Sequence, residues 1–452
     1  MVRLLVIGGS DAGISAALRA HELEPEVAID LVLADAFPNY SICGLPFFLS
    51  GETPDWHMLA HRTTFDGITI HPEHRAERID LAKRKVYVTH SAGAREFSYD
   101  RLLLGTGARP RQLSIPGEEL PGVFLLHTMK DSFRVNDFLE EAKPKRAVIV
   151  GAGYIGLEMA DALTHRGIEV TVISRPATTL PTVDAPLGEK VATELRKHGV
   201  DVLASTEVRE ITQAGDHLRV LTSVGYRDCE MVLVAAGVIP NTILGEQAGF
   251  PTGEGGALRV DRQMRTGVPD VFVAGDCGET WHRLLERNIY LPLGTTAHKQ
   301  GRVAGENMLG GSREFAGSLG TQVVKIFDLV IARTGLREHE ARAAGRAPYT
   351  TDIVVNDHKA YYPGATPIQI RVTADRESGK LLGAQMIGAY KAEVAKRIDI
   401  FATALFHRMT VDQVSDLDLS YTPPLSSPWD PVQMACQAWS NTHKPISGGV
   451  HV

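Results

Sequence analysis

Cysteine is scarce in this chain of 452 residues, and its four cysteines form no recognisable pair. Neither a Cys-x-x-Cys nor a Cys-x4-Cys spacing occurs, so the sequence contains neither a dithiol redox motif nor a disulfide framework. Unpaired thiols are typical of a reducing compartment. Because strand-like residues begin at Val2, we expect no signal peptide and a cytoplasmic location.

Long apolar runs and an excess of positive charge are also missing. No segment approaches the roughly 18 consecutive apolar residues of a membrane span. The net charge is −7 at pH 7, which gives no indication of a nucleic-acid or membrane partner. We also predict no metal site. At this length, with 44% hydrophobic residues, we expect two or three domains that each bury a core.

Glycine, in contrast, is plentiful, and two glycine-rich turns organise the chain. They are Gly8-Gly9-Ser10-Asp11-Ala12-Gly13 and Gly151-Ala152-Gly153-Tyr154-Ile155-Gly156. Each turn follows an apolar strand and precedes a helical stretch and a second strand, at residues 29–33 and 169–173. In that context the glycines allow a tight turn and a close approach of a pyrophosphate to a helix N-terminus. The sequence therefore predicts two dinucleotide-binding units, although Ser10 replaces the middle glycine of the first motif.

The residues after the two second strands distinguish the two nucleotides. Asp35 follows the first strand, 22 residues after Gly13, where a carboxylate can bind a ribose diol; a solvated turn aspartate is the alternative. The second strand ends in Ser174 and Arg175 without an acidic residue. Arg175 is placed to bind a 2′-phosphate, which favours NADPH over NADH, although an exposed arginine at a strand end is also common.

Cys43 lies in the segment Ser41-Ile42-Cys43-Gly44-Leu45-Pro46, after the first of these second strands. Pro46 suits the first turn of a helix, which would place Cys43 near a helix N-terminus. The positive end of the helix dipole favours a thiolate there. The segment predicts a lone redox-active thiol beside a cofactor, and an inert structural cysteine is the alternative.

From about Thr321 onward the pattern changes to that of an α+β domain without a nucleotide motif. Four segments have strand character and one has helical periodicity: 323–332, 352–355, 368–373, 381–388 and, for the helix, 391–408. The tail around Ser447, Gly448 and Gly449 indicates a flexible end.

Taken in order, these motifs resemble the pyridine nucleotide–disulfide oxidoreductase flavoproteins. The single-cysteine branch is the most similar: coenzyme A-disulfide reductases, persulfide reductases, NADH oxidases and NADH peroxidases. The resemblance covers residues 2 to about 440. Besides the two glycine turns, it rests on CGLP at 43–46, YDRLLLGTGA at 99–108, VAAGVIPN at 234–241, VFVAGD at 271–276, AHKQGR at 297–302, YYPG at 361–364 and DLSYTPP at 418–424.

The resemblance implies an α/β protein with two Rossmann-like domains and a C-terminal α+β dimerisation domain. The FAD-binding domain would comprise 1–112 and 245–320, the NAD(P)-binding domain 113–244, and the dimerisation domain 321–452. In the family this last domain forms a homodimer and delivers residues to the partner's active site. Tyr361 and Tyr421 are the expected catalytic contributions, with Tyr362 as a rival to Tyr361.

The resemblance also implies roles for the motif residues. Gly8, Gly9 and Gly13 would approach the FAD pyrophosphate, with Asp35 at the adenosine ribose. Asp276 would bind a ribityl hydroxyl, and the helix from Thr295 would direct its N-terminus at the flavin. Gly151, Gly153 and Gly156 would hold NADP(H) or NAD(H), with Tyr154 as a gate over the flavin and Glu158 near the nicotinamide. Further expected cofactor contacts are Ser10, Asp11, Ala12, Thr106, Gly107, Ile155, Ser174, Arg175, Gly237, Gly275, Thr296 and Ala297.

The implied reaction transfers electrons from NADPH through FAD to an oxidised Cys43, which reduces a small-molecule disulfide or persulfide. Oxidases and peroxidases of this branch usually carry a histidine where this chain has Asp11, and a carboxylate there would oppose a nearby thiolate. Ile42 replaces the usual asparagine, and the first helix mixes Arg19 with Glu22, so coenzyme A itself stays open as substrate. An NAD(P)H oxidase that reduces O2 and a flavoprotein redox sensor are the alternatives.

Overall fold

The computed structural model describes residues 2–443, and the tail predicted at 447–449 lies outside them. The first of its sheets is five-stranded and parallel, in the order β18-β7-β1-β2-β3. Its strands are β1 (Arg3–Ile7), β2 (Ala28–Val32), β3 (Ile68–His71), β7 (Arg101–Leu104) and β18 (Val271–Val273). All strands of the second sheet lie between β7 and β18 along the chain. The first sheet is therefore built from two segments, one before and one after the second sheet in sequence.

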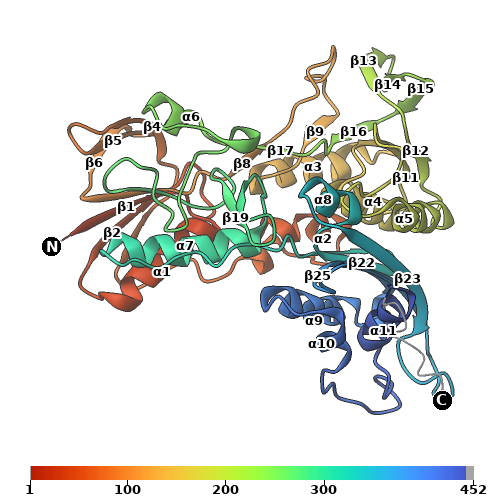
Figure 1. Ribbon diagram of the computed structural model, residues 1–452. Coiled ribbons are helices and arrows are strands. Elements are labelled where there is room, and N and C mark those ends of the chain that lie inside the picture. The colour runs from red at the N-terminus through yellow and green to blue at the C-terminus, as the bar shows by residue number, and fades with distance from the viewer. Residues whose placement is uncertain (1, 444–452) are drawn as a thin grey trace, which may run out of the picture.

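Two long helices, α1 (Asp11–Leu23) and α7 (Gly294–Met308), lie side by side against this first sheet (Figure 1). Their close approach depends on glycine. A Cβ at Gly301 would lie 2.2 Å from the carbonyl oxygen of Ala12, and one at Gly305 would lie 2.2 Å from that of Ala16. The start of α7 is thereby fixed beside the first glycine turn, although the two segments are almost 300 residues apart.

The second parallel sheet has the order β12-β11-β10-β16-β9. Its strands are β9 (Val123–Leu125), β10 (Arg146–Val150), β11 (Glu169–Ile173), β12 (Asp201–Leu203) and β16 (Met231–Val234), and its helices are α3 (Met129–Ala142), α4 (Tyr154–His165) and α5 (Ala185–Lys197). The central strands are buried along almost their whole length, as is typical of a sheet covered on both faces. The antiparallel pair β8 (Ala108–Pro110) and β17 (Val238–Pro240) connects the two parallel-sheet units.

The C-terminal sheet is antiparallel, in the order β21-β22-β25-β24-β23. Its strands are β21 (Gln322–Ile326), β22 (Leu329–Gly335), β23 (Pro348–Asn356), β24 (Pro367–Asp375) and β25 (Leu381–Ala389). The single strand predicted at 323–332 is wrong, because the chain turns at Phe327, where φ is +51°. The helix predicted at 391–408 is α9 (Val394–Phe406).

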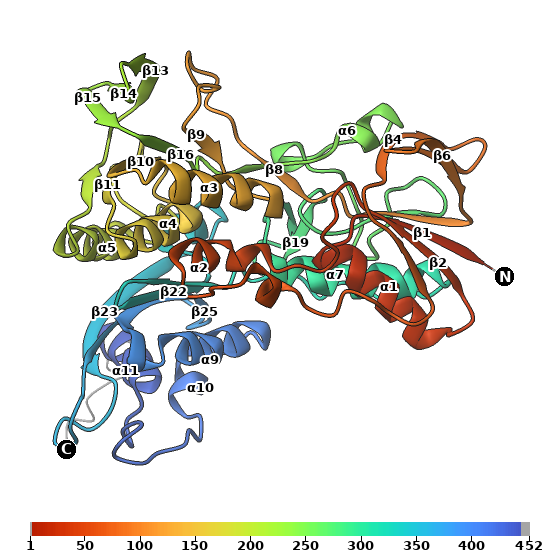
Figure 2. The same cartoon turned by 180° about the vertical axis from the view of Figure 1, so that it is seen from behind.

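The C-terminal sheet lies between two packed layers (Figures 1 and 2). α9, with the helices α10 (Val411–Ser415) and α11 (Pro431–His443), shares one hydrophobic core with β24 and β25. On the other side, Val324, Ile326 and Ile331 join a core with α4 and with the short helix α2 (Leu45–Ser50). The C-terminal domain therefore shares a hydrophobic core with the segment that follows Cys43, and α4 contacts both β21 and α2.

The remaining elements are short. They are the antiparallel strands β4 (Arg75–Asp80), β5 (Lys85–His90), β6 (Gly93–Ser98), β13 (Val208–Ala214), β14 (His217–Thr222), β15 (Gly225–Cys229), β19 (Thr280–His282) and β20 (Arg287–Ile289), and the helices α6 (Ile243–Gln247) and α8 (Glu338–Ala343). Within residues 2–443, no helix is long and apolar enough to cross a bilayer.

Candidate cofactor-binding and redox site

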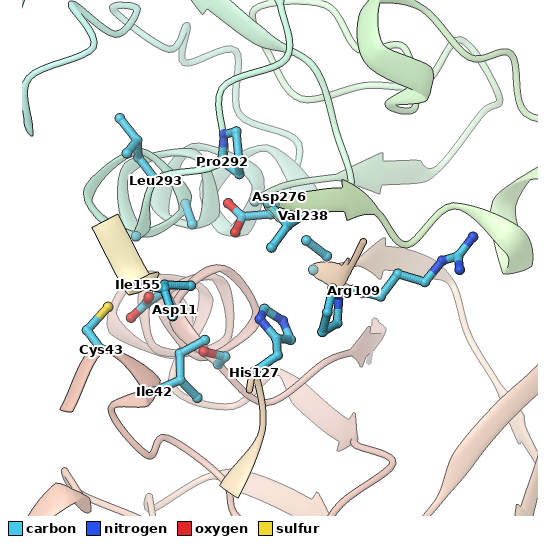
Figure 3. Close-up of a pocket in the computed structure, with 18 of the residues that line it drawn as sticks. Asp11, Ile42, Cys43, Arg109, His127, Ile155, Val238, Asp276, Pro292 and Leu293 are labelled. Carbon is cyan, nitrogen blue, oxygen red and sulfur yellow. The ribbon is translucent and has the colours of Figure 1, made fainter. Parts of the chain in front are cut away.

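A cavity of about 2720 Å³ extends between the two parallel sheets and reaches the C-terminal domain. Ordinary small-molecule sites measure about 300–1,000 Å³, so this volume suits ligands as large as two dinucleotides. The cavity lies where strands β1, β2, β10 and β11 end, because the residues that follow each of these strands line it. Carboxyl ends of parallel strands are the usual position of nucleotide sites in such folds. Figure 3 shows Cys43, Asp11 and Asp276 around part of this cavity.

In the first glycine turn, some residues line the cavity, whereas Gly13 allows the helix α1 to pack against the turn. Gly8 has φ +117°, and a Cβ there would lie 2.1 Å from the carbonyl oxygen of Gly105. Residues 8–12 line the cavity, whereas Gly13 does not. A Cβ at Gly13 would lie 1.9 Å from the carbonyl oxygen of Gly8, so this glycine allows α1 to pack on the turn. Gly13 therefore has a packing role in the turn, and its contact with a pyrophosphate stays a prediction.

The second glycine turn repeats this geometry. Gly151 has φ +123°, and a Cβ there would lie 2.2 Å from the carbonyl oxygen of Ala235. A Cβ at Gly156 would lie 2.0 Å from the carbonyl oxygen of Gly151, and Gly156 does not line the cavity. Gly153 lines it, and among the described residues no atom lies within 4 Å of a Cβ built there. This open space at the N-terminus of α4 suits a pyrophosphate group.

The two residues predicted to distinguish the nucleotides both line the cavity. The Asp35 carboxylate accepts a hydrogen bond from the Phe37 amide at 2.8 Å, and burial raises its pKa. Arg175 is exposed directly after β11, and among residues 2–443 it makes no ion pair. Ser174 is buried and donates to the Pro176 carbonyl at 3.2 Å, which fixes the loop that carries Arg175.

The other predicted cofactor contacts also lie on the cavity wall. They are Thr106, Gly107, Ile155, Gly237, Gly275, Thr295, Thr296 and Ala297. Thr106 donates to the Asn241 carbonyl at 2.6 Å, and this bond joins the two segments that connect the parallel-sheet units.

Asp276 lines the cavity three residues after the end of β18. Burial and the nearby carboxylate of Asp11 raise its pKa to about 6, while the backbone amide of Leu293 opposes the shift. The buried side chain of Gln300 accepts a hydrogen bond from the Gly275 amide at 2.8 Å and donates to the Thr280 hydroxyl at 3.1 Å. Gln300 lies within the AHKQGR motif at 297–302, but an internal glutamine on a helix does not by itself predict a bond to the backbone of Gly275.

Cys43 lies in the 3-10 turn Ile42–Gly44, directly before α2, and Pro46 is in the first turn of that helix as predicted. It is the exposed cysteine among the four, because Cys229, Cys277 and Cys436 are buried. Figure 3 shows its sulfur on the side of Asp11. Although its side chain is exposed to the open cavity, partial desolvation by the surrounding protein raises the pKa of Cys43, and so do the carboxylates of Asp11, Glu158 and Asp276. The predicted preference for a thiolate at the helix N-terminus is therefore opposed by desolvation and by three acidic neighbours.

Glu158 projects from α4 into the same cavity. Burial and the carboxylate of Asp161 raise its pKa to about 7, although Lys325 opposes this effect. Lys325, from β21, donates to the Asp161 carboxylate at 3.0 Å. Close to neutral pH, Glu158 can therefore either hold or release a proton in the cavity that contains Cys43.

Comparison with known proteins identifies the family. The family model described as "Pyridine nucleotide-disulphide oxidoreductase" matches residues 2–301, and the model of its dimerisation domain matches residues 321–431. The chain belongs to this family. It is an oxidoreductase with Rossmann-like sheets and a C-terminal dimerisation domain, and its cofactors are FAD and NAD(P)H. The predicted fold class, enzyme class and cofactors are thus confirmed.

Several relatives are similar over almost the whole chain. The "NAD(P)H sulfur oxidoreductase (CoA-dependent)" of Pyrococcus furiosus is 34% identical over 95% of this chain and 97% of its own length. An "NADH oxidase" of Methanocaldococcus jannaschii is 32% identical over 96% of this chain and 98% of its own. Among solved structures, a "NAD-Dependent Persulfide Reductase from A. fulgidus" is 35% identical, has a TM-score of 0.93, and matches over 97% of this chain and 83% of the other.

The dimerisation domain of this oxidoreductase carries the three predicted tyrosines on its surface. Tyr361, Tyr362 and Tyr421 are 72%, 43% and 44% exposed, and none of them lines the cavity of its own chain among the described residues. Their two loops are joined, because the Lys359 amide donates to the Pro423 carbonyl at 3.4 Å. A cluster of exposed aromatic side chains of this kind is typical of a protein–protein interface.

Proposed function

We propose that this oxidoreductase is a homodimer that uses NADPH to reduce a small-molecule disulfide or persulfide through Cys43. The observation that carries the proposal is the position of its one exposed cysteine on a cavity shared by both glycine turns. Without a second cysteine nearby, the oxidised form of Cys43 is a bond to a substrate sulfur or a sulfenic acid, and not an internal disulfide. The relatives described as sulfur oxidoreductase and persulfide reductase support this substrate class.

The sulfur chemistry balances with one cysteine. The Cys43 thiolate attacks a substrate disulfide; a bond forms between Cys43 and one substrate sulfur, and the second sulfur leaves as a thiolate that takes up a proton. Gly8, Gly9 and Asp276 would hold FAD, which would supply two electrons that come from NADPH. With these electrons and one further proton, Cys43 returns to the thiolate and the first substrate thiol is released. A persulfide substrate follows the same scheme, with hydrogen sulfide as one of its products.

Residues around Cys43 can accept and donate the protons that this scheme requires. Because Glu158 has a pKa of about 7, it can accept the proton of the Cys43 thiol and return a proton to a leaving thiolate. Asp11 lies beside Asp276 and adds negative charge to the cavity. This charge disfavours an anionic sulfenate at Cys43, which supports disulfide or persulfide reduction over peroxide chemistry.

NADPH preference and the shared active site are further parts of the proposal. The unpaired guanidinium of Arg175 on the cavity wall supports recognition of a 2′-phosphate. The exposure of Tyr361 and Tyr421 supports a role in the partner's site, where a phenol would protonate the leaving thiolate; Tyr362 stays a rival.

We retain 1–112 with 245–320 as the FAD domain, 113–244 as the NAD(P) domain and 321–452 as the dimerisation domain.

A second candidate is an NAD(P)H oxidase that reduces O2, because the relative from Methanocaldococcus jannaschii is described as an NADH oxidase. Anaerobic NADPH consumption separates the two functions. The substrates are coenzyme A disulfide, coenzyme A persulfide and glutathione disulfide, with an aerobic sample without sulfur substrate as comparison. We expect rapid consumption with at least one sulfur compound and slow consumption in air. Rapid consumption in air alone would establish the oxidase.

The Cys43→Ser variant gives the matched control for this assay. We expect it to keep FAD and NADPH-dependent dye reduction, because neither requires the thiol, and to lose turnover of the sulfur substrate. Full turnover by the variant would refute the role of Cys43.

A further inference from the structure

Tyr154, the first residue of α4, stands within the second glycine turn and lines the cavity beside Gly153 and Glu158. Its half-buried side chain lies on the same cavity wall as Gly151 and Gly153. A dinucleotide bound along this turn therefore lies close to the Tyr154 side chain. What holds Tyr154 in place bears directly on how a nucleotide reaches the cavity.

The hydroxyl of Tyr154 is held by two hydrogen bonds from different parts of the chain. It donates to Oε1 of Gln322 at 2.5 Å and accepts from the hydroxyl of Thr182 at 3.1 Å. Burial raises the pKa of Tyr154, so the phenol keeps the proton that it donates to Gln322. Both partners also line the cavity.

Both partners are positioned by the C-terminal domain. Gln322 is the first residue of β21, and so belongs to that domain itself. Thr182 lies in the loop before α5, but its carbonyl accepts a hydrogen bond from Arg333 of β22 at 2.6 Å. The same loop is bound at Pro181, whose carbonyl accepts from Arg337 at 2.7 Å.

The end of this loop is anchored as well. The amide of Asp184 donates to Gln385 at 2.7 Å, and its carboxylate accepts from Arg371 at 3.1 Å. The loop at 181–184 is thus fixed to the C-terminal sheet by backbone and side-chain bonds. Two independent connections therefore run from the C-terminal sheet to one phenol in the nucleotide domain.

We propose that Gln322 and Thr182 form a latch on the Tyr154 hydroxyl, through which the C-terminal domain restrains access of the nicotinamide dinucleotide to the cavity. The latch consists of these two hydrogen bonds, and binding of the nucleotide requires that they break. This inference rests on the proposed function, because it takes the nicotinamide dinucleotide as the ligand of the second glycine turn. Gln322 and Thr182 are positioning residues in this account.

The test uses near-isosteric variants of the holoenzyme: Gln322→Met, Thr182→Val and Tyr154→Phe. The dissociation constants of NADP+ and NAD+ are measured by calorimetry, without turnover. Each latch bond joins uncharged groups and must break before the nucleotide binds. Removal of one such bond should therefore lower the dissociation constant of the nucleotide about twofold to tenfold. Thr193→Val on α5 and Gln213→Met on β13 are matched controls, since neither residue touches Tyr154.

A double-mutant cycle gives the readout that a general loss of stability would not produce. We expect Gln322→Met to tighten binding in the wild-type background and to have no further effect in Tyr154→Phe, where the donor is already absent. Unchanged or weaker binding in Gln322→Met or Thr182→Val, or additive effects in the double variant, would overturn the latch. If Gln322→Met does not fold, Thr182→Val with Tyr154→Phe forms the same cycle. Failure of the wild-type protein to bind either nucleotide would instead refute the proposed function.

Discussion

The electrostatic environment of Cys43 gives a quantitative prediction for Glu158→Gln. The carboxylate of Glu158 is one of the causes that raise the pKa of Cys43, after burial and Asp11. Removal of this negative charge should therefore make the thiolate easier to form. Since Cys43 is exposed, solvent screens the interaction, and we take the upper end of the range for exposed charge pairs, about 1 kcal/mol. This energy corresponds to about a fivefold larger thiolate fraction.

The effect of Glu158→Gln on the reactivity of Cys43 should depend on pH. Glu158 has a pKa of about 7, so below that pH the wild-type side chain is protonated and carries no charge, as does glutamine. Above pH 7 the wild-type carboxylate is ionised and opposes the thiolate. The ratio of thiolate reactivity, Glu158→Gln over wild type, should therefore be close to one at pH 6 and rise to about fivefold at pH 8–8.5.

Iodoacetamide alkylation measures this ratio directly. The oxidised holoenzyme is treated anaerobically without NADPH, and incorporation is followed by intact-protein mass. Cys229, Cys277 and Cys436 are buried, so a single label is expected under native conditions. Glu141→Gln, an exposed substitution of the same type on α3, is the control and should leave the rate unchanged. A ratio that is independent of pH, or that falls below one at high pH, would refute the reasoning.

Two further variants test the nucleotide site. Gly156→Ala should lower the free energy of unfolding in denaturant by about 1–3 kcal/mol, because its Cβ would meet the carbonyl oxygen of Gly151 at 2.0 Å. Gly153→Ala is the control and should leave this free energy unchanged. Equal stabilities of the two variants would contradict the packing role of Gly156. Arg175→Ala should lower kcat/KM for NADPH by about tenfold to a hundredfold and leave that for NADH within about twofold, as expected for a lost charge-assisted phosphate contact. Equal losses for both nucleotides would contradict 2′-phosphate recognition.

The glycine turns were predictable because their physics is local. A strand, a turn with positive φ and a helix must follow one another in sequence, and Gly8 and Gly151 meet this requirement in the same way. The roles of Gly13 and Gly156 were harder to predict, because only the folded turn shows that each faces a carbonyl oxygen and not the cavity. The turn at Phe327 was missed because apolar residues continue on both sides of it without glycine or proline.

The electrostatics of the site could not be predicted from local sequence. The helix that follows Cys43 indicated a stabilised thiolate, but Asp11, Glu158 and Asp276 come from three distant segments that the fold brings to one cavity. Gln322 was missed for the same reason. Its partner Tyr154 lies 168 positions away in the sequence, and no motif connects them.

The most direct test of the central claim is to trap the oxidised form of Cys43. The holoenzyme is incubated anaerobically with coenzyme A disulfide, persulfide or glutathione disulfide but without NADPH, and the bound sulfur is located by peptide mass spectrometry. We predict one substrate-derived sulfur substituent per chain, on the peptide that contains Cys43, and its release on addition of NADPH. An unmodified Cys43 in a protein that nevertheless reduces the same compound with NADPH would contradict the account.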